Sequence, residues 1–441
     1  MSMLKRKKKL LVLAISIAIL AFGWVSFQAA KATADEKTVY ERLKLFSDVM
    51  NLIQDHYVEE VASEKLVYGA ISGMLRELDA HSSFLRPEDY KELQIETKGK
   101  FGGIGIEITL RNGVLTVVAP LEDTPADRAG IQANDQIIKI DGTPTQEMTL
   151  MEAVQKMRGP KGTKVQLTIL REGERKPLEF ELTRDIISVQ SVRSQEIEKG
   201  IGYVRISSFQ SGTSRDLARE LDRLEKGSGP LQGLVLDLRN NPGGLLDQAV
   251  AVADEFLDSG LIVYTGGRRE SQQMKFEAQK NGTPRPYPMV VLVNGGSASA
   301  SEIVAGALQD HKRAVILGED TFGKGSVQTV IPLNDGSAVR LTTAVYYTPS
   351  GRSIQAKGIE PDILVKRELP VASGAAEEPD HRVREKDLPR HMEAPEGEEP
   401  VANEDEGEVE QPTRILEKDN QLRRAVDLLK GYKIMAQMQF Q

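Results

Sequence analysis

The sequence predicts an α/β protein of several domains, and three observations support this fold class. Past Asp185, apolar strands alternate with helical segments over short loops, which favours a sheet that is parallel at its centre. Residues 96–185 contain short strands around one helix, and residues 35–95 carry apolar side chains at helical spacing. A chain of 441 residues with 40% hydrophobic content can bury two or three separate cores.

The first 34 residues have the pattern of an export signal. Five adjoining cations, Lys5 to Lys9, precede the apolar run Leu10 to Phe27, and small residues follow as far as Ala34. This pattern predicts export across a bacterial-type membrane into the periplasm or cell envelope. The run is long enough either for the core of a cleaved signal or for an inner-membrane anchor, so both alternatives stay open.

Composition excludes several kinds of chemistry. The chain has no cysteine, which rules out disulfides and thiolate catalysis. Its net charge of −8 comes largely from residues 377–410, where 14 Asp and Glu face 4 Lys and Arg. The only cationic cluster lies in the N-terminal segment, so no nucleic-acid partner is expected.

The N- and C-terminal regions are predicted to be helical, with a linker before the last helix. Residues 35–95 are expected to form a helical domain, in which Asp79 to Ser83 make a turn and His81 is a loop residue. Residues 366–413, rich in Pro, Glu, Ala and Gly, are expected to be an acidic disordered linker. Residues 414–441 then predict a C-terminal helix, with Leu422, Val426, Leu429 and Ile434 as its apolar positions.

A serine-rich segment at a predicted strand-to-helix turn is the strongest candidate for chemistry. The apolar strand Met289 to Val293 leads into a run of small residues, and a helical pattern follows. Such a turn exposes a hydroxyl and points backbone N–H groups at the group under attack, which suits acyl transfer. Ser297, Ser299 and Ser301 are the candidate nucleophiles, with Ser299 favoured. Ser301 followed by Glu302 also fits a helix start.

A serine nucleophile needs a neighbouring base that is uncharged at the working pH. Among the five histidines, His311 lies at the far end of the helix that Ser299 opens, roughly 15 Å away. Lys324 is the better candidate, because burial can lower the pKa of an amine by several units. Gln328 lies in a predicted strand over residues 326–333, from which its carbonyl could accept a hydrogen bond from the lysine amine.

Two further features bear on the site. The N–H of Ala300 and one N–H from the Gly243-Gly244 turn, which follows a buried strand, are candidate oxyanion donors. The run from Gly318 to Lys324 has the spacing of a phosphate-binding loop, but Gly325 stands where Ser or Thr is required. No cluster of His, Asp and Glu has metal-ligand spacing, so neither a metal nor a cofactor is predicted.

Four motifs stand out, namely Phe101-Gly-Gly-Ile-Gly-Ile106, Asp237-Leu-Arg-Asn-Asn-Pro-Gly-Gly244, Gly296-Ser-Ala-Ser-Ala-Ser-Glu-Ile303 and Thr321-Phe-Gly-Lys-Gly325. Together they resemble the carboxyl-terminal processing peptidases, also called tail-specific proteases, over residues 40–365. The resemblance implies a Ser299 and Lys324 dyad with Gln328, and Gly244 and Ala300 as oxyanion donors. It also implies a cap and core related to crotonase and ClpP-like α/β spirals, a catalytic core at 186–365 and an inserted, mostly β PDZ domain at 96–185.

The PDZ assignment carries its own physical expectation for substrate binding. Backbone N–H groups in this region can form a nest for a terminal carboxylate, and the edge strand 104–108 can take the substrate tail as an extra strand. Ile106 and Val154 would line a pocket for apolar terminal side chains, although both also fit a plain core role. The residues of the expected nest are Gly102, Gly103, Ile104 and Gly105.

The sequence therefore predicts an exported serine endopeptidase that recognises C-terminal tails on its PDZ domain and cleaves them through an acyl-enzyme. The alternative is a catalytically idle PDZ adaptor that delivers tails to another envelope protease. Expected partners are proteins or peptides with accessible C-terminal tails, and the membrane if the N-terminal segment is retained. A regulatory lipoprotein and a homo-oligomer both stay open.

Overall fold

The computed structural model describes residues 39–111, 113–227, 229–279, 285–368, 384–388, 390–392, 416 and 418–438. The predicted export segment lies outside these residues. No helix within the described ranges is long and apolar enough to cross a membrane. The chain divides into two compact units, one up to Leu75 and the other from Arg76 onward.

The first unit contains the helices expected near the N-terminus. One helix spans residues 39–56, and α2 (Ser63–Arg76) follows it. The apolar stripe of the first helix is largely exposed, with Phe46 and Val49 each 46% accessible and Leu43 61% accessible.

The centre of the second unit is a six-stranded sheet in the order β10-β11-β12-β15-β16-β19. From β11 to β19 each neighbouring pair is parallel, and only β10 runs antiparallel, at the edge, which confirms the predicted parallel centre. The strands are β10 (Val192–Glu198), β11 (Ile201–Ile206), β12 (Gly233–Asp237), β15 (Met289–Val293), β16 (Val315–Gly318) and β19 (Ile363–Leu364).

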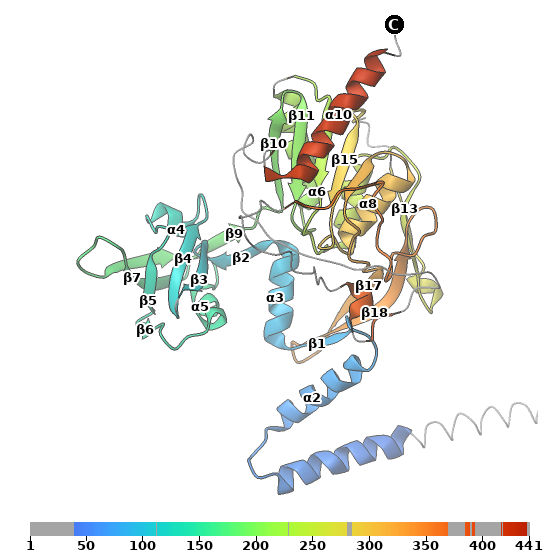
Figure 1. Cartoon of the computed structure of the whole chain (residues 1–441). Helices are drawn as coiled ribbons and strands as arrows, with labels where there is room; N and C mark the ends of the chain where they lie inside the picture. The colour runs from blue at the N-terminus through green and yellow to red at the C-terminus, as the bar shows by residue number, and fades with distance from the viewer. Residues whose placement is uncertain are drawn as a thin grey trace, which may run out of the picture. The chain divides into compact units, whose positions relative to one another are not determined.

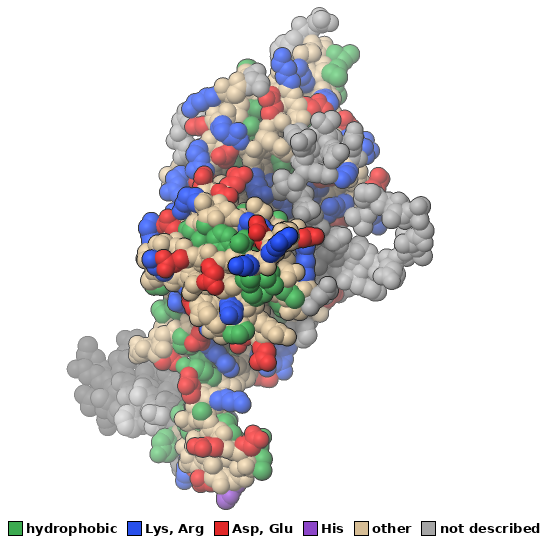
Figure 2. Space-filling model, turned by 90° about the vertical axis from the view of Figure 1, so that its left-hand side faces the viewer, with side chains coloured by type: hydrophobic (Ala, Val, Ile, Leu, Met, Phe, Trp, Pro, Cys, Tyr) green, Lys and Arg blue, Asp and Glu red, His purple; other side chains and the backbone are tan. Residues whose placement is uncertain are grey.

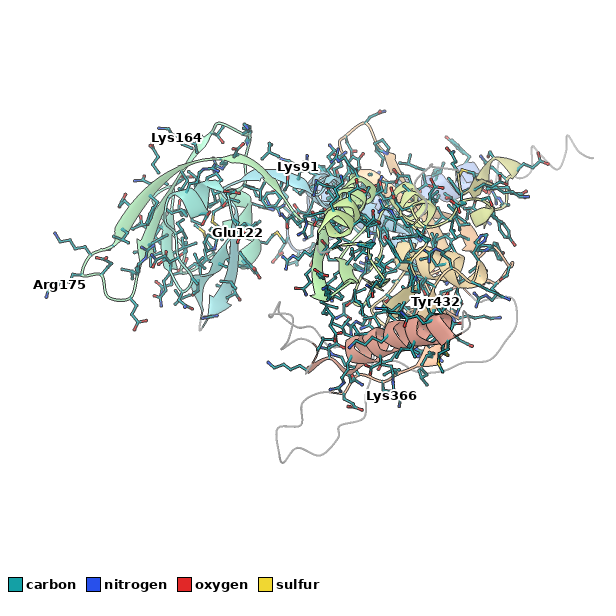
Figure 3. All side chains as sticks on the ribbon, turned by 90° about the horizontal axis from the view of Figure 1, so that it is seen from above. Lys91, Glu122, Lys164, Arg175, Lys366 and Tyr432 are labelled. Atoms are coloured by element: carbon teal, nitrogen blue, oxygen red, sulfur yellow. The ribbon has the colours of Figure 1, made fainter. Side chains whose placement is uncertain are left out.

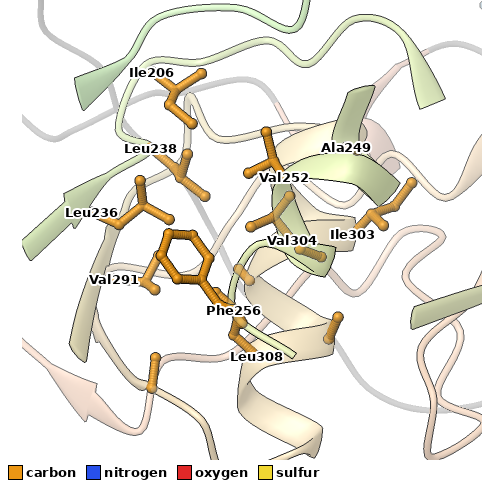
Figure 4. Packing of buried hydrophobic residues seen from close by; sticks show 14 of the residues in the cluster. Ile206, Leu236, Leu238, Ala249, Val252, Phe256, Val291, Ile303, Val304 and Leu308 are labelled. Atoms are coloured by element: carbon orange, nitrogen blue, oxygen red, sulfur yellow. The ribbon is translucent and has the colours of Figure 1, made fainter. Parts of the chain in front are cut away.

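Helices cover both faces of this sheet, because side chains alternate along each buried strand. Leu236 and Val291 point to the face packed by helices that include Val252 of α7 and Val304 of α8 (Figure 4). Val235 belongs to the opposite core, where α10 lies along the sheet (Figure 1). The helices are α6 (Thr213–Lys226), α7 (Leu246–Asp254), α8 (Ala300–Asp310) and α10 (Asn420–Met438).

A second sheet carries the segments that follow the lysine motif. Its strands are ordered β1-β18-β13-β14, and β17 also pairs with β18. Because β17 begins at Ser326, the lysine lies in the loop that leads into this sheet. The strands are β1 (Ser83–Leu85), β13 (Leu261–Gly266), β14 (Lys275–Glu277), β17 (Ser326–Pro332) and β18 (Ala338–Tyr347).

The β-rich region folds as the PDZ prediction requires. Its sheet has the order β3-β4-β5-β7-β8, with β6 beside β5, so β3 stands at an edge. A separate ribbon, β2 paired with β9, leads in and out, and α3 (Pro87–Lys98) precedes β2. The elements are β2 (Lys100–Gly103), β3 (Ile106–Arg111), β4 (Val114–Pro120), α4 (Pro125–Arg128), β5 (Gln136–Ile140), β6 (Thr143–Pro144), α5 (Leu150–Met157), β7 (Lys164–Leu170), β8 (Leu178–Thr183) and β9 (Asp185–Ser188).

The predicted C-terminal helix is present as α10, and it packs through the apolar positions nearest its start. Leu422 and Val426 are buried, whereas Ile434 is 58% exposed and Tyr432, labelled in Figure 3, is 55% exposed. On the face shown in Figure 2, Lys and Arg side chains are interspersed with Asp and Glu, so that face presents no field of a single sign.

The structure corrects the prediction of a disordered linker at one place. Within residues 366–413, the short 3-10 helix η2 (Glu385–Asp387) has a defined position, and the Glu385 side chain is fully buried. Composition favoured a solvated chain, but a buried carboxylate is stable where specific polar partners meet it. Those partners are distant in sequence and are described with the site.

Candidate active site

Three loops meet at one edge of the parallel sheet. They follow the carboxyl ends of β12, β15 and β16, which are adjacent parallel strands. The first loop carries Gly243 and Gly244, the second Ser299 and the third Lys324. This is the edge at which open α/β sheets bind their ligands.

Ser299 has the backbone conformation of a strained turn. Its φ and ψ are 57° and −111°, which a residue with a side chain rarely adopts. It is the N-cap of α8, so the helix starts two residues earlier than the Ser301-Glu302 pair suggested. The Ser299 N–H donates to Glu302 Oε2 at 2.6 Å, and its side chain is only partly buried.

The two competing serines have structural hydrogen bonds. Ser297 is fully buried and its hydroxyl donates to the Leu238 carbonyl at 2.8 Å. Ser301 is also fully buried, and its hydroxyl donates to the Asn241 carbonyl at 2.9 Å. Both bonds fix the serine loop against the loop after β12, and they leave Ser299 as the favoured nucleophile.

The two-glycine turn lies directly against Ser299 and Ala300. Gly243 and Gly244 have φ of 100° and 141°, which favour glycine. A Cβ on Gly243 would lie 2.8 Å from the Ser299 Cβ and 3.0 Å from the Ala300 nitrogen. Asn241 holds the turn by accepting the Gly243 N–H at 2.9 Å. Because Ala300 is the first residue of α8, its N–H has no acceptor inside the helix.

Glu302 joins the serine turn to the lysine loop, and the sequence did not single it out for this role. Its fully buried carboxylate accepts the N–H groups of Ser299, at 2.6 Å, and Lys324, at 3.0 Å. It also accepts the Gly323 N–H at 2.7 Å and the Thr321 hydroxyl at 2.5 Å. Burial raises the pKa of Glu302 to about 7, although these four donors favour the ionised form. The sequence signal that could have indicated this role is a glutamate three residues after Ser299, the N-cap of α8.

The surroundings of Lys324 favour its neutral form. The side chain is partly buried, and burial lowers the pKa of its amine. The cation of Arg340 lowers this pKa further, while three carboxylates, those of Glu385, Glu302 and Asp79, oppose the shift. The net direction is the one that a lysine base requires.

Tyr346 is a second link between the two motifs. It is 3% exposed, and its hydroxyl donates to the carbonyl oxygen of Lys324. The same hydroxyl is hydrogen-bonded to the Ser299 side chain. Burial raises the pKa of Tyr346 well above its usual value, so the phenol stays protonated and can donate.

Gln328 does not have the geometry that a regular strand predicts. The strand begins only at Ser326, and its register shifts between Val327 and Gln328, so the same-face relation to Lys324 does not apply. The Gln328 amide nitrogen donates to the Ser326 hydroxyl at 2.9 Å. A role for Gln328 beside the lysine stays a prediction.

Neither histidine near these motifs is placed as a base for Ser299. His311 caps the far end of α8, and its Nε2 lies 2.7 Å from the Leu261 carbonyl. His81 lies in the expected turn, where the Asp79 carboxylate accepts the backbone N–H of His81 at 2.7 Å. Sequence reasoning missed that the His81 ring contacts Glu385, at 2.5 Å from Nε2 to Oε2.

The predicted tail-binding residues surround the edge strand of the PDZ sheet. Ile106 opens β3 and Val154 lies on α5, and both are partly buried. Ile104 is 2% exposed and belongs to the domain core, so only its backbone is available to a ligand. Gly105 has φ of 77°, and a Cβ there would lie 2.3 Å from Thr124 Cβ. Gly102 and Gly103 belong to β2, which pairs with β9.

A strained serine, a glycine turn and a shielded amine at one sheet edge are typical of serine peptidases, and the PDZ fold adds a peptide-binding surface. Comparison with known families agrees. The model of peptidase family S41 matches residues 200–365, a PDZ domain model matches residues 92–170, and the activating protease CtpB N-terminal domain matches residues 24–88.

Curated relatives are similar over most of the chain. A carboxy-terminal-processing protease of Bartonella bacilliformis is 50% identical over 340 residues, covering 77% of this chain and 78% of that protein. A carboxyl-terminal-processing protease of Synechocystis is 43% identical, covering 72% and 75%. The solved photosystem II D1 C-terminal processing protease is 33% identical, with a TM-score of 0.43, and covers 73% and 92%. The chain therefore belongs to peptidase family S41, a serine protease family, and carries a PDZ domain.

Proposed function

We propose that this chain is an exported serine endopeptidase that binds C-terminal tails of protein substrates on its PDZ domain and cleaves them through an acyl-enzyme. Ser299 is the nucleophile and Lys324 the base, with Gln328 orienting the amine. The N–H groups of Gly244 and Ala300 stabilise the oxyanion. A periplasmic or envelope location follows from the N-terminal export pattern.

The proposed reaction balances with water as the only co-reactant. The Ser299 oxygen attacks the scissile carbonyl carbon while its proton passes to the neutral Lys324 amine. The resulting ammonium gives that proton to the departing nitrogen as the C–N bond breaks, which leaves an ester on Ser299. Lys324 then takes a proton from water, and the hydroxide attacks the ester carbonyl. As the acyl C–O bond breaks, the Lys324 ammonium gives its proton to the Ser299 oxygen, which releases the carboxylic acid product and restores both groups.

One observation carries the proposal, namely that a single buried carboxylate holds both motifs. Glu302 accepts the N–H groups of Ser299 and Lys324 within 3.0 Å. The burial that lowers the pKa of Lys324 supports its assignment as base. The apolar residues Ile106, on the edge strand, and Val154, on α5, support recognition of apolar tails.

Replacing Lys324 by arginine tests the base. A guanidinium stays protonated at any working pH, so we expect hydrolysis of an unfolded, apolar-tailed substrate to fall below detection. Mass spectrometry of the substrate gives the readout, and circular dichroism checks that the variant is folded. Retained turnover in Lys324→Arg would rule out this amine as the base.

The rival function, an idle adaptor, makes a different prediction in the same assay. Wild type and Ser299→Ala would then cleave equally or not at all, while both bind the tail peptide. Under the proposed function the two proteins bind the peptide with similar affinity, and only wild type releases products.

A further inference from the structure

The segment around η2 makes contacts on both sides of the catalytic lysine. We call the described residues of this segment, 384–388 and 390–392, the strap. The Glu385 N–H donates to the Phe322 carbonyl at 3.3 Å, two residues before Lys324. On the other side, Gln355 accepts the Gly325 N–H at 2.9 Å and donates to Glu385 Oε1 at 2.9 Å.

The Glu385 carboxylate is the centre of this attachment. It is fully buried, with His81 Nε2 2.7 Å from Oε1 and 2.5 Å from Oε2. Its negative charge acts on Lys324, where it favours the ammonium form. An ammonium cannot accept the serine proton, so the docked carboxylate opposes the reaction that the amine is proposed to perform.

Peripheral contacts fix the rest of the strap. Arg384 forms an ion pair with Asp320 at 3.3 Å. The Met392 carbonyl accepts a hydrogen bond from Gln355 at 3.2 Å. Arg390 donates to the Arg76 carbonyl at 2.6 Å and pairs with Glu77 at 3.0 Å. The strap therefore contacts the lysine loop through Arg384 and the segment that precedes β1 through Arg390.

These contacts are polar, which makes the strap easier to release than its neighbours. Among its described residues, none is a buried hydrophobic side chain, and Leu388 and Met392 are only partly buried. By contrast, α10 is held by the buried side chains of Leu422 and Leu429. Segments with little buried apolar surface open at a small fraction of the global unfolding free energy.

We propose that the strap is a built-in inhibitor, which closes the lysine side of the active site when docked and leaves when a substrate chain enters. The docked state occupies the Phe322 carbonyl and the Gln355 amide, and it keeps the Glu385 carboxylate where its charge acts on Lys324. This inference rests on the proposed function, since it assumes that Lys324 acts as base for Ser299.

Releasing the strap should increase activity. For Glu385→Ala in the purified full-length chain, we expect kcat/KM on a short unstructured peptide to rise roughly tenfold, because a hydrogen bond to a charged group shifts a two-state equilibrium by about that factor. Glu172→Ala, at an exposed carboxylate on a turn of the PDZ domain, is the matched control and should not change the rate. Labelling of Ser299 by a fluorophosphonate should accelerate in parallel.

Locking the strap should decrease activity. Because the chain has no native cysteine, a thiol reagent would modify only the cysteines introduced for this test. Arg390 and Glu77 are 52% and 70% exposed, so the pair Arg390→Cys and Glu77→Cys can be joined by a short bismaleimide. We expect the joined protein to lose roughly tenfold or more in kcat/KM, by the same two-state argument. The same double variant capped with N-ethylmaleimide carries no tether and lacks the Arg390 contacts, so it should be at least as active as wild type.

The outcomes separate this inference from the function on which it rests. If Ser299→Ala still cleaves, the proposed function fails. If Ser299→Ala is inactive but Glu385→Ala is unchanged or slower while folded, the inhibitor role is wrong. Should Glu385→Ala fold poorly, the cross-linked protein decides, because full activity with the strap locked overturns the inference.

Discussion

Replacing Glu302 by glutamine removes one negative charge and half of the hydrogen-bond acceptors between the serine turn and the lysine loop. The carboxylate has four donors, from Thr321, Gly323, Ser299 and Lys324. An amide has one oxygen, and its NH₂ group would face donors on the other side. The Thr321 hydroxyl can rotate to accept, but the Gly323 N–H cannot.

Two opposing free-energy terms decide the effect on stability. An orphaned buried N–H costs about 1–3 kcal/mol. Against this, burial of the charged carboxylate raises the Glu302 pKa from 4.5 to about 7. At 1.36 kcal/mol for each pKa unit, this shift corresponds to a cost of about 3 kcal/mol for burying the charge, and a neutral amide avoids that cost. The terms nearly cancel, so we expect the free energy of unfolding to change by less than about 2 kcal/mol.

Activity should respond much more strongly than stability. A catalytic group displaced by about 1 Å can cost on the order of 100-fold in rate. In either orientation of the glutamine amide, its NH₂ group faces a backbone N–H of the lysine loop, that of Gly323 or that of Lys324, and pushes this loop away from the serine turn. We expect kcat to fall by at least about that factor, measured on an unfolded peptide, beside thermal unfolding of the same sample. Glu172→Gln, an exposed carboxylate of the PDZ domain, is the control. If the kcat of Glu302→Gln lies within about threefold of the wild-type value, the positioning argument is wrong.

Three further predictions address the other parts of the site. Gly243→Ala should abolish turnover while binding of a tail peptide persists, because the new Cβ would lie 2.8 Å from the Ser299 Cβ; isothermal titration and a cleavage assay separate the two. Asp419→Ala should lower the free energy of unfolding by about 1–3 kcal/mol, since Arg239 loses contacts at 2.7 and 3.0 Å, and unchanged urea unfolding would contradict this. The rate should rise with pH through a pKa below the usual lysine value, because only the neutral Lys324 amine accepts a proton. Burial and the Arg340 cation lower the pKa of Lys324, although three carboxylates oppose this shift. A rate that falls as the pH rises through this range would contradict the assignment.

The sequence was sufficient for features that depend on local pattern. Short continuous apolar runs that alternate with helical patterns predicted the parallel strands β12 and β15. The small residues around Ser299 predicted the sharp turn, and the observed positive φ agrees with it. The edge position of β3 followed from the PDZ resemblance.

The sequence was insufficient where a contact joins distant segments. Glu385 lies in a stretch whose composition indicates disorder, and its partners His81 and Gln355 precede it by 304 and 30 residues. The position of Gln328 also escaped prediction, because a register shift within β17 alters which residues share a face. Neither the contacts of Glu385 nor the register shift in β17 can be predicted from the spacing of neighbouring residues in a single sequence.

The ion pairs of Arg239 connect the loop that carries the glycine turn to the last helix, so this loop has all its contacts only when that helix has been made. Arg239 precedes the glycine turn by four residues and is held by Asp237 and, from the start of α10, by Asp419. A ribosome makes this last helix after every other described part of the enzyme. A chain that ends before Asp419 would contain both reactive groups and yet leave the loop beside them without its outer support. Stop codons or trimming that remove Asp419 are therefore expected to influence a reaction centre that lies far upstream in the chain.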